Sequence, residues 1–423
     1  MGRLTVTVLA FAFLSGTNPN AVSAGDEELE KAGDILQLLL PVAGFAATYI
    51  DRDPVGRIQF LKAAVTTGVS VGGIKFAVSK QRPDQSADNS FPSGHTAAAF
   101  MGAGFIQTRY GPTFGVPALA LGVLTGYSRV NADRHFADDV VAGMSFGLMS
   151  NWLWVTRRKY DDVAFTPTYE GGRMGVNLDL FKLSASTPAP AGWKPKWRYE
   201  FEFGAAFRDK NEMTAPRGSG QTLDFAQFDD TQDPTETAHV QISRFWGAEN
   251  ENDVALKFWP FEVRDFATPK QDTTWNNTVF AAGVQGSAQY RMYETRLRYR
   301  RHLVNKQHFD FMLGVALSYQ DLTMRVTNAD GADTRVDDHV FIPLIHLHIG
   351  FKIDKRWKIY GDFDAIKLSD DEQYEGSLML QYQANKNWDI GIGARYFDRI
   401  TDTDSFTQDF QLTRAIIRLG YSW

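Results

Sequence analysis

The C-terminal stretch Ala415-Ile-Ile-Arg-Leu-Gly-Tyr-Ser-Trp423 indicates the fold of the second half of the chain. In an extended strand, successive side chains point to opposite faces. One face would therefore carry Ala415, Ile417, Leu419, Tyr421 and Trp423, and the other Ile416, Arg418, Gly420 and Ser422. An apolar face backed by an arginine and small residues is typical of a strand that separates lipid from a polar interior.

Similar alternating segments, rich in aromatic residues, recur along the second half of the chain. They are roughly 10 to 14 residues long, which is longer than the usual strand of a soluble sheet. We expect strands at Trp197–Phe207, Val254–Phe266, Tyr290–Val304, Phe309–Tyr319, Val340–Phe351, Tyr374–Tyr382 and Trp388–Tyr396. Segments of this length and pattern favour an antiparallel transmembrane β-barrel over the alternative, a soluble β-sandwich.

The connections between these segments alternate in length. Asn305–Gln307 and Asn385–Asn387 are short, whereas Asp209–Thr235 and Asp321–Asp338 are long. Outer-membrane barrels have short turns on one side and long loops on the other. This pattern predicts ten strands, and it would give twelve if Met174–Phe181 and Val279–Gln289 were also strands. A C-terminal aromatic residue such as Trp423 resembles the signal that the barrel-assembly machinery recognises, so we expect that machinery as a partner.

The first half of the chain has the period of helices. We expect helices at Leu29–Ile50, Val55–Lys80, Ser93–Tyr110, Thr113–Arg129 and His135–Lys159. A membrane span needs about 20 mainly apolar residues. Ile35–Ile50 is free of charge but contains Gln37 and Pro41, so a compact helical bundle fits at least as well as a membrane bundle.

The start of the chain has the layout of a secretory signal peptide. Arg3 precedes the apolar run Leu4–Leu14, and small residues lead to a cleavage site after Ala24. The predicted organisation is therefore a signal peptide (1–24), a helical domain (25–160), a linker (161–195) and a barrel (196–423). The chain has no cysteine and a net charge of −6, which excludes disulfides, thiolate metal sites and a basic surface for nucleic acid.

Three stretches of the helical half carry the candidate chemistry: Lys75–Pro83, Pro92–His95 and Ser128–Asp139. Lys75 and Arg82 are seven residues apart, which would place both cations on one face of a helix that Pro83 ends. Two such cations suit an anion with several oxygen atoms.

The second and third stretches add an anion site and a base. Ser93 precedes an alanine-rich run, so it is a predicted N-cap, and the helix start beside His95 would bind phosphate. His135 and Asp139 are four residues apart, so on a helix the carboxylate could accept a proton from one imidazole nitrogen and leave the other free to attack. Taken alone, each feature is more often a surface contact or a cap, but together and in this order they predict a phosphate-transfer site.

These stretches resemble, position for position, the three-part signature of the type 2 phosphatidic acid phosphatase superfamily: K-x6-R-P, P-S-G-H and S-R-x5-H-x3-D. That superfamily includes bacterial acid phosphatases and vanadium haloperoxidases. The resemblance implies a helical bundle in which His135 is the nucleophile, Asp139 orients it and His95 protonates the leaving oxygen. It also implies a phosphate cradle made of Lys75, Arg82, Ser93, Gly94 and Arg129, with no metal or other cofactor and with vanadate as an inhibitor.

We therefore expect a metal-independent phosphatase that forms a phosphohistidine and acts on phosphate monoesters, with lipid phosphates or pyrophosphates favoured. The signal peptide and barrel predict a location in the bacterial outer membrane, with the catalytic domain in the periplasm. The short connection between Pro83 and Pro92 suggests an open pocket that admits a membrane-held substrate. Three alternatives remain: an acid phosphatase for soluble esters, a vanadium-dependent haloperoxidase, and a channel or adhesin barrel with an accessory helical domain.

Overall fold

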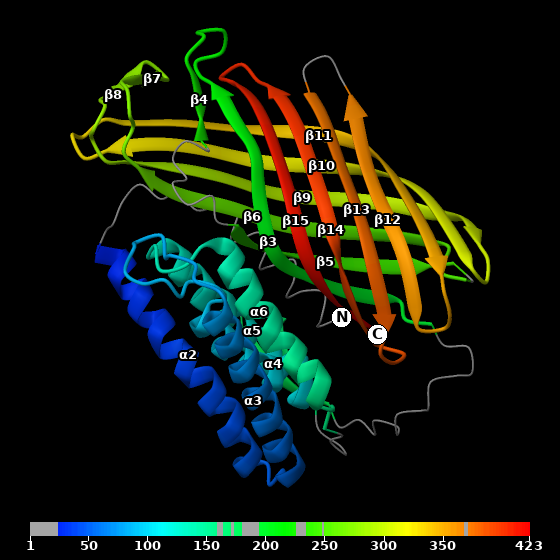
Figure 1. Cartoon of the computed structure of the whole chain (residues 1–423). Helices are drawn as coiled ribbons and strands as arrows, with labels where there is room; N and C mark the ends of the chain where they lie inside the picture. Colours follow the sequence, from blue (N-terminus) through cyan, green and yellow to red (C-terminus); the bar gives the residue numbers. More distant parts are fainter. Residues whose placement is uncertain are drawn as a thin grey trace. The chain divides into compact units, whose positions relative to one another are not determined.

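The computed structural model describes residues 24–158, 164–170, 173–179, 194–225, 234–247, 249–367 and 371–423 (Figure 1). The chain divides into two compact units, residues 1–193 and 194–423. Apart from Ala24, the predicted signal peptide lies outside the described residues, as do residues 180–193 of the predicted linker.

The first unit contains the five expected helices. They are α2 (Ala24–Ile50), α3 (Pro54–Ala77), α4 (Gly94–Tyr110), α5 (Pro112–Asn131) and α6 (Ala137–Trp154). The centre of the bundle is α4 against α6, where glycines allow the two backbones to touch. A Cβ atom at Gly143 of α6 would lie 2.4 Å from the carbonyl oxygen of Ser93. This contact brings the start of α4 next to the start of α6, and Ser93 N–H donates to the Asp139 carbonyl at 2.9 Å.

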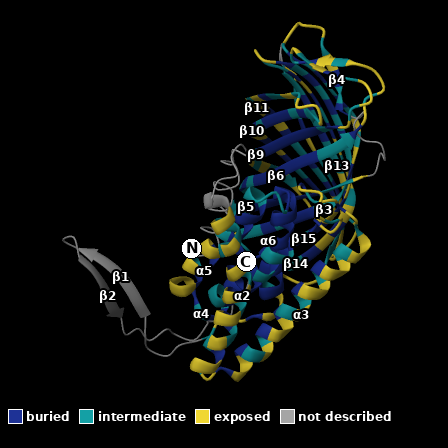
Figure 2. Ribbon diagram, turned by 90° about the vertical axis from the view of Figure 1, so that its left-hand side faces the viewer, coloured by how far each residue is buried: buried dark blue, intermediate teal, exposed yellow. Residues whose placement is uncertain are grey.

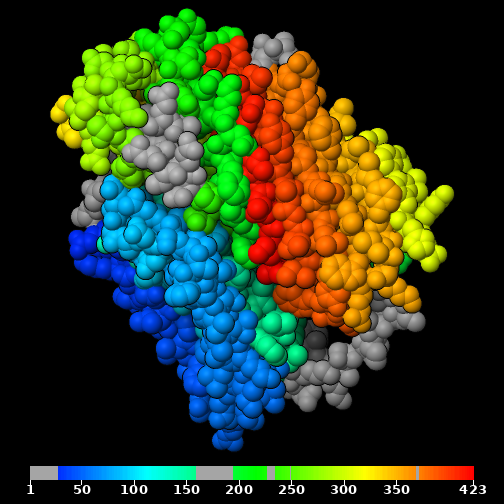
Figure 3. All heavy atoms as spheres, in the orientation of Figure 1, coloured from blue at the N-terminus to red at the C-terminus, as the bar shows by residue number. Residues whose placement is uncertain are grey.

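The second unit is a closed barrel of ten antiparallel strands, as expected. The strands are β3 (Trp197–Thr214), β5 (Thr235–Trp246), β6 (Asn252–Ala267), β9 (Gly286–Asn305), β10 (Phe309–Asn328), β11 (Asp333–Lys352), β12 (Trp357–Lys367), β13 (Asp371–Gln383), β14 (Trp388–Asp402) and β15 (Thr407–Ser422). Each strand pairs with the next in this order, and β15 pairs with β3 to close the barrel. Figure 3 shows this closure as the green strand β3 beside the red strand β15.

The twelve-strand alternative is wrong. Met174–Phe181 falls largely in β2 (Arg173–Asp179), which pairs only with β1 (Ala164–Glu170) in a separate two-stranded sheet. Val279–Gln289 is divided between the short β8 (Thr278–Phe280) and the beginning of β9. Among the described residues, five short strands thus lie outside the ten: β1 and β2, which pair with each other, β8 with its partner β7 (Thr273–Trp275), and β4 (Thr222–Asp224), which pairs with the end of β3.

The expectation of a long loop at Asp321–Asp338 is also wrong. β10 continues to Asn328 and β11 begins at Asp333, so the two strands pair almost to a tight turn. The inward side chains Leu322, Met324 and Val336 are buried and continue the apolar alternation. The outward positions carry charges, including the ion pair between Arg325 and Asp333 at 2.6 Å. The strand was missed because the expected pattern requires apolar outward side chains, and the outward side chains here are polar.

The outer wall of the barrel has the apolar character predicted for a transmembrane barrel. On β10, Leu313, Val315 and Leu317 are exposed, while the intervening Ala316 and Ser318 point inward and are buried. The alternation expected for the last strand is present, since Ile417 is exposed whereas Ile416, Arg418 and Ser422 are buried.

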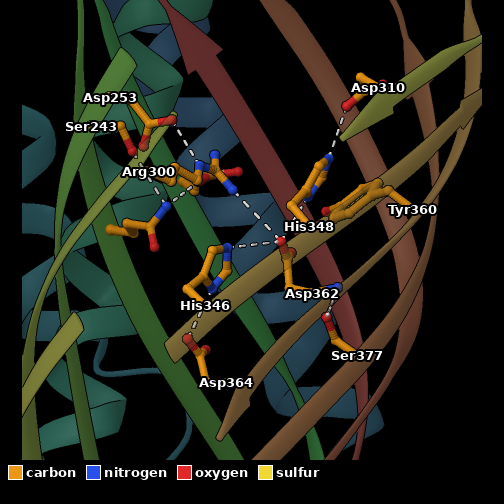
Figure 4. A network of polar contacts seen from close by, with 12 residues as sticks. Ser243, Asp253, Arg300, Asp310, His346, His348, Tyr360, Asp362, Asp364 and Ser377 are labelled. Atoms are coloured by element: carbon orange, nitrogen blue, oxygen red, sulfur yellow. Dashed lines mark hydrogen bonds and ion pairs between the residues drawn. The ribbon is translucent and has the colours of Figure 1, made fainter. Parts of the chain in front are cut away.

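The interior of the barrel has two zones. One is a core of aromatic and aliphatic side chains that includes Trp259, Phe261, Tyr290, Phe397 and Phe410. The other is a network of ion pairs around a cavity of about 250 Å³. Figure 4 shows part of this network, in which Arg300 pairs with Asp253 at 2.7 Å and His346 with Asp364 at 2.8 Å.

Candidate active site

The anion-binding end of the site is the N-terminus of α4. Ser93 is the N-cap, as expected, and its hydroxyl accepts from Thr96 N–H at 3.4 Å and from the Thr96 hydroxyl at 3.0 Å. Ala97 N–H makes the first hydrogen bond of the helix, to the Ser93 carbonyl at 3.0 Å. The N–H groups of Gly94 and His95 precede that bond, so they belong to the orphan donors of a helix start, where an anion is favoured.

The two cations of the first motif approach this helix start from α3 and the segment after it. The expectation of a shared helical face is wrong, because α3 ends at Ala77 and Val78 is extended. Arg82 lies beyond the helix, where Pro83 disfavours helical geometry for its predecessor. Lys75 nevertheless donates to the Asn89 carbonyl and Arg82 to the Asn89 side chain at 3.1 Å, so both cations converge on one loop. A Cβ at Gly94 would lie 4.0 Å from Lys75 Cε, which puts Lys75 beside the helix start.

The predicted nucleophile is buried beside its predicted carboxylate. His135 Nδ1 lies 3.5 Å from Asp139 Oδ2 and 3.3 Å from the Ser90 hydroxyl. Contrary to expectation, the two residues do not lie on one helix, because α6 begins at Ala137. Instead, Asp139 Oδ2 accepts from Phe136 N–H at 2.9 Å, so the same carboxylate caps α6 and faces the imidazole. With Nδ1 directed at these partners, Nε2 is the ring nitrogen available for attack.

Two residues that the sequence analysis did not select complete the surroundings of Asp139. Lys80 Nζ lies 2.9 Å from Asp139 Oδ1 and 2.8 Å from Asp138 Oδ2, and all three side chains are buried. The Ser90 hydroxyl donates to Asp139 Oδ2 at 2.5 Å. Burial alone would raise the pKa of Asp139, but Lys80, His135 and Ser90 outweigh it and hold that pKa well below its usual range. The carboxylate therefore stays ionised and can stabilise positive charge on His135.

The other two predicted residues, His95 and Arg129, meet a carboxylate from a different helix. Asp34 Oδ1 of α2 lies 3.1 Å from His95 Nε2 and 2.9 Å from Arg129 Nη1. Arg129 Nη2 also donates to the Glu30 carbonyl at 2.6 Å. Neither Asp34 nor Glu30 was predicted, and no spacing within the motifs could have indicated them.

The electrostatic influences show that these groups share one site. The pKa of His95 is lowered to about 4, chiefly by burial and also by the positive charges of Arg129, His135 and Arg82, while Asp34 acts to raise it. Burial also lowers the pKa of Lys75 to about 8, helped by Arg82 and opposed by Asp139. Burial and mutual repulsion destabilise the protonated forms of His95 and Lys75. A bound anion offsets both effects, so it stabilises these protonated side chains.

The cations and the helix start can therefore bind a tetrahedral anion. Among the described residues, no group of three or more histidine and carboxylate side chains is placed to hold a metal ion. The structure brings together Lys75, Arg82, His95, Arg129, His135 and Asp139, with Ser93 and Gly94 at the adjoining helix start.

Comparison with known proteins agrees with this geometry. The model of the PAP2 superfamily matches residues 58–162. A lipid A 4'-phosphatase of Helicobacter pylori is 30% identical over 149 residues, which cover 33% of this chain and 75% of that protein. The chain therefore belongs to the PAP2 superfamily.

Three further likenesses concern parts of the chain. A lipid A 1-phosphatase of Porphyromonas gingivalis is 37% identical over 125 residues, which make up 28% of this chain and 26% of that protein. The crystal structure of Aquifex aeolicus LpxE is 21% identical, with a TM-score of 0.29, and the match covers 35% of this chain and 93% of that one. The outer membrane protease OmpT of Escherichia coli is 10% identical, with a TM-score of 0.35, over 54% of this chain and 97% of that one.

Proposed function

We propose that this protein is a phosphatase that hydrolyses lipid phosphate monoesters through a phosphohistidine on His135. The observation that carries the proposal is the buried His135–Asp139 pair beside the cations at the start of α4. Phosphoryl transfer mainly requires positioning and stabilisation of charge on the equatorial oxygens, and this cluster provides both.

The reaction has two balanced steps. In the first, His135 Nε2 attacks phosphorus, the ester P–O bond breaks, and His95 gives its proton to the departing alkoxide. In the second, water attacks the phosphohistidine, His95 takes a proton from that water, and the P–N bond breaks to release phosphate. The lowered pKa of His95 is compatible with the acid role, because the dianion of the substrate raises the pKa of a neighbouring imidazole.

A lipid substrate is supported by the surface of the helical unit. Along α2, Ile35, Leu38 and Val42 are exposed at helical spacing, and along α3 so are Ile58 and Val65 (Figure 2). The residues Glu27–Ile50 of α2 are long and apolar enough to cross a membrane, by length and composition. Exposed apolar faces of this extent favour contact with lipid. The two curated relatives are named as lipid A phosphatases, so we propose a phosphorylated glycolipid of that class as the physiological substrate.

The barrel supports a location in the outer membrane, with the helical unit in the periplasm. The catalytic site would then act on lipid at the inner surface of that membrane, where tethering raises the local concentration of enzyme. Heat-modifiability on a gel after cell fractionation tests the barrel. Protease added to intact cells tests on which side of the outer membrane the helical unit lies. We expect the unit to be protected, and its cleavage without permeabilisation would contradict the periplasmic placement.

The activity is tested on the purified full chain in detergent. We expect at least about tenfold higher kcat/KM on phosphatidate in mixed micelles than on para-nitrophenyl phosphate, because remote binding energy is used in the transition state. Vanadate should inhibit and a chelator should change nothing. Equal kcat/KM values would favour a soluble-ester phosphatase, and halide oxidation that requires vanadate would replace the proposal with a haloperoxidase.

A further inference from the structure

The proton donor of the proposed reaction is held by a carboxylate from outside the matched domain. The PAP2 match begins at residue 58, whereas Asp34 lies in the middle of α2. Its Oδ1 atom contacts both His95 Nε2 at 3.1 Å and Arg129 Nη1 at 2.9 Å. The two groups that meet the leaving oxygen and the phosphate are therefore joined by one carboxylate oxygen.

The sequence of α2 allows this close approach. A Cβ at Gly33 would lie 2.0 Å from the Ser128 hydroxyl and 2.9 Å from Arg129 Nη2, so only glycine lets the helix reach α5 here. Four residues before Asp34, Glu30 lies on the same face and accepts from Arg129 through its carbonyl and from Arg134 through its side chain at 2.8 Å. α2 is thus anchored to the site at two successive turns.

We propose that Asp34 is the positioning residue of His95, and that its carboxylate competes with the substrate for the same donors. This inference rests on the proposed phosphatase function. An ionised carboxylate 3.1 Å from Nε2 favours a proton on that nitrogen, as Asp139 favours one on the facing nitrogen of His135. Unlike Asp139, which is completely buried, Asp34 is 49% exposed and can turn away when a phosphate group arrives.

The charges around His95 determine the direction of the effects. It is faced by Arg129 from α5, by His135 and Arg82 from the neighbouring segments, and by Asp34 from α2. Asp34 is the only carboxylate among these named influences, so it favours the protonated imidazole while the others oppose it. Removing its charge should therefore strengthen anion binding and weaken proton donation, which are opposite effects from one substitution.

The test compares Asp34→Asn with Glu28→Gln, which removes a charge from an exposed position of the same helix. With Asp34→Asn we expect vanadate to bind roughly fivefold to tenfold more tightly in calorimetry. We also expect kcat on an alkyl phosphate at neutral pH to fall about tenfold or more, and its alkaline limb to move to lower pH. On para-nitrophenyl phosphate, whose leaving group needs little protonation, kcat should change by less than about threefold. Asp34→Glu should restore part of the alkyl phosphate rate.

The inference is overturned if Asp34→Asn matches Glu28→Gln in all these measurements, or if it slows both substrates equally without a shift of the pH profile. If Asp34→Asn does not fold, Asp34→Ser answers the same questions. Wild-type enzyme without phosphatase activity would refute the proposed function itself. Active wild-type enzyme with an unchanged Asp34→Asn variant would refute only the role of Asp34.

Discussion

Both units of this protein contain buried histidine–carboxylate pairs among arginines and lysines, but the pairs differ in how many nitrogens of the imidazole ring they use. In the barrel, His348 uses both ring nitrogens, with Nδ1 2.7 Å from Asp362 and Nε2 3.0 Å from Asp310. In the helical unit, the described contacts of the His135 ring are made by Nδ1, to Asp139 and Ser90. A histidine committed at both nitrogens holds structure together, whereas one committed at a single nitrogen retains a nucleophile.

The balance of charge differs in the same way. In the barrel, Glu375 is within 3.5 Å of Lys257, Arg296, Arg395 and Arg414, so cations there surround buried carboxylates. At the start of α4, Lys75, Arg82 and Arg129 are gathered where a helix terminus already favours negative charge. The first arrangement neutralises itself, and the second is completed by an anion.

The largest expected effect on activity comes from removing His135 Nε2. His135→Ala should lower kcat by about 10⁴-fold or more, because the proposed covalent intermediate forms on this imidazole. Steady-state phosphate release measures this loss. The matched change in the barrel, His348→Ala, should leave kcat of the folded protein unchanged. A comparable loss of kcat in both variants would show that the two histidines do not differ in this way.

The next largest effect concerns proton donation. His95→Ala should slow alkyl phosphates by about 10²-fold to 10⁴-fold, the usual contribution of a general acid. The loss on para-nitrophenyl phosphate should be much smaller, since its leaving group departs without a proton. Equal losses, measured as kcat on the two substrates, would show that His95 does not act as the acid.

Charge removal in the barrel should affect stability instead of chemistry. Glu375→Gln leaves three buried cations and the half-buried Arg395 without their shared carboxylate, so we expect the free energy of unfolding of the barrel to fall by about 3 to 5 kcal/mol. The midpoint of urea unfolding in detergent, followed by heat-modifiability, measures this change. Phosphatase activity per folded molecule should stay the same, and an unfolding midpoint equal to that of the wild type would contradict a structural role for the network.

The smallest predicted effect is a pH dependence of anion binding. The pKa of Lys75 is lowered to about 8, so the free enzyme loses this positive charge as the pH rises through that value. Vanadate affinity should therefore fall by roughly tenfold above about pH 8, the effect of losing one charged hydrogen bond. Lys75→Arg should remove this limb, because arginine stays charged. An unchanged pH dependence in Lys75→Arg would assign the limb to another group.

The sequence predicted contacts between residues that are close in the chain better than contacts between distant segments. Short-range spacing within the motifs predicted which residues meet, even though Arg82 and His135 lie outside the helices expected for them. The contribution of α2 could not be predicted, because Asp34 reaches His95 only through the packing of α2 on α5 that Gly33 permits. In the barrel, the alternating pattern predicted ten strands but missed their extension past Asp321, where outward residues become polar.

The phosphohistidine proposal is tested most directly by identifying the residue that becomes phosphorylated. Enzyme mixed with a rapidly cleaved phosphate ester is quenched in alkali, which preserves phosphohistidine, and its peptides are analysed by mass spectrometry. We predict one phosphoryl group on His135 and none on His95, with no phosphorylated peptide from His135→Ala. A phosphoryl group on another residue, or multiple turnover by His135→Ala at the wild-type rate, would contradict the proposed chemistry.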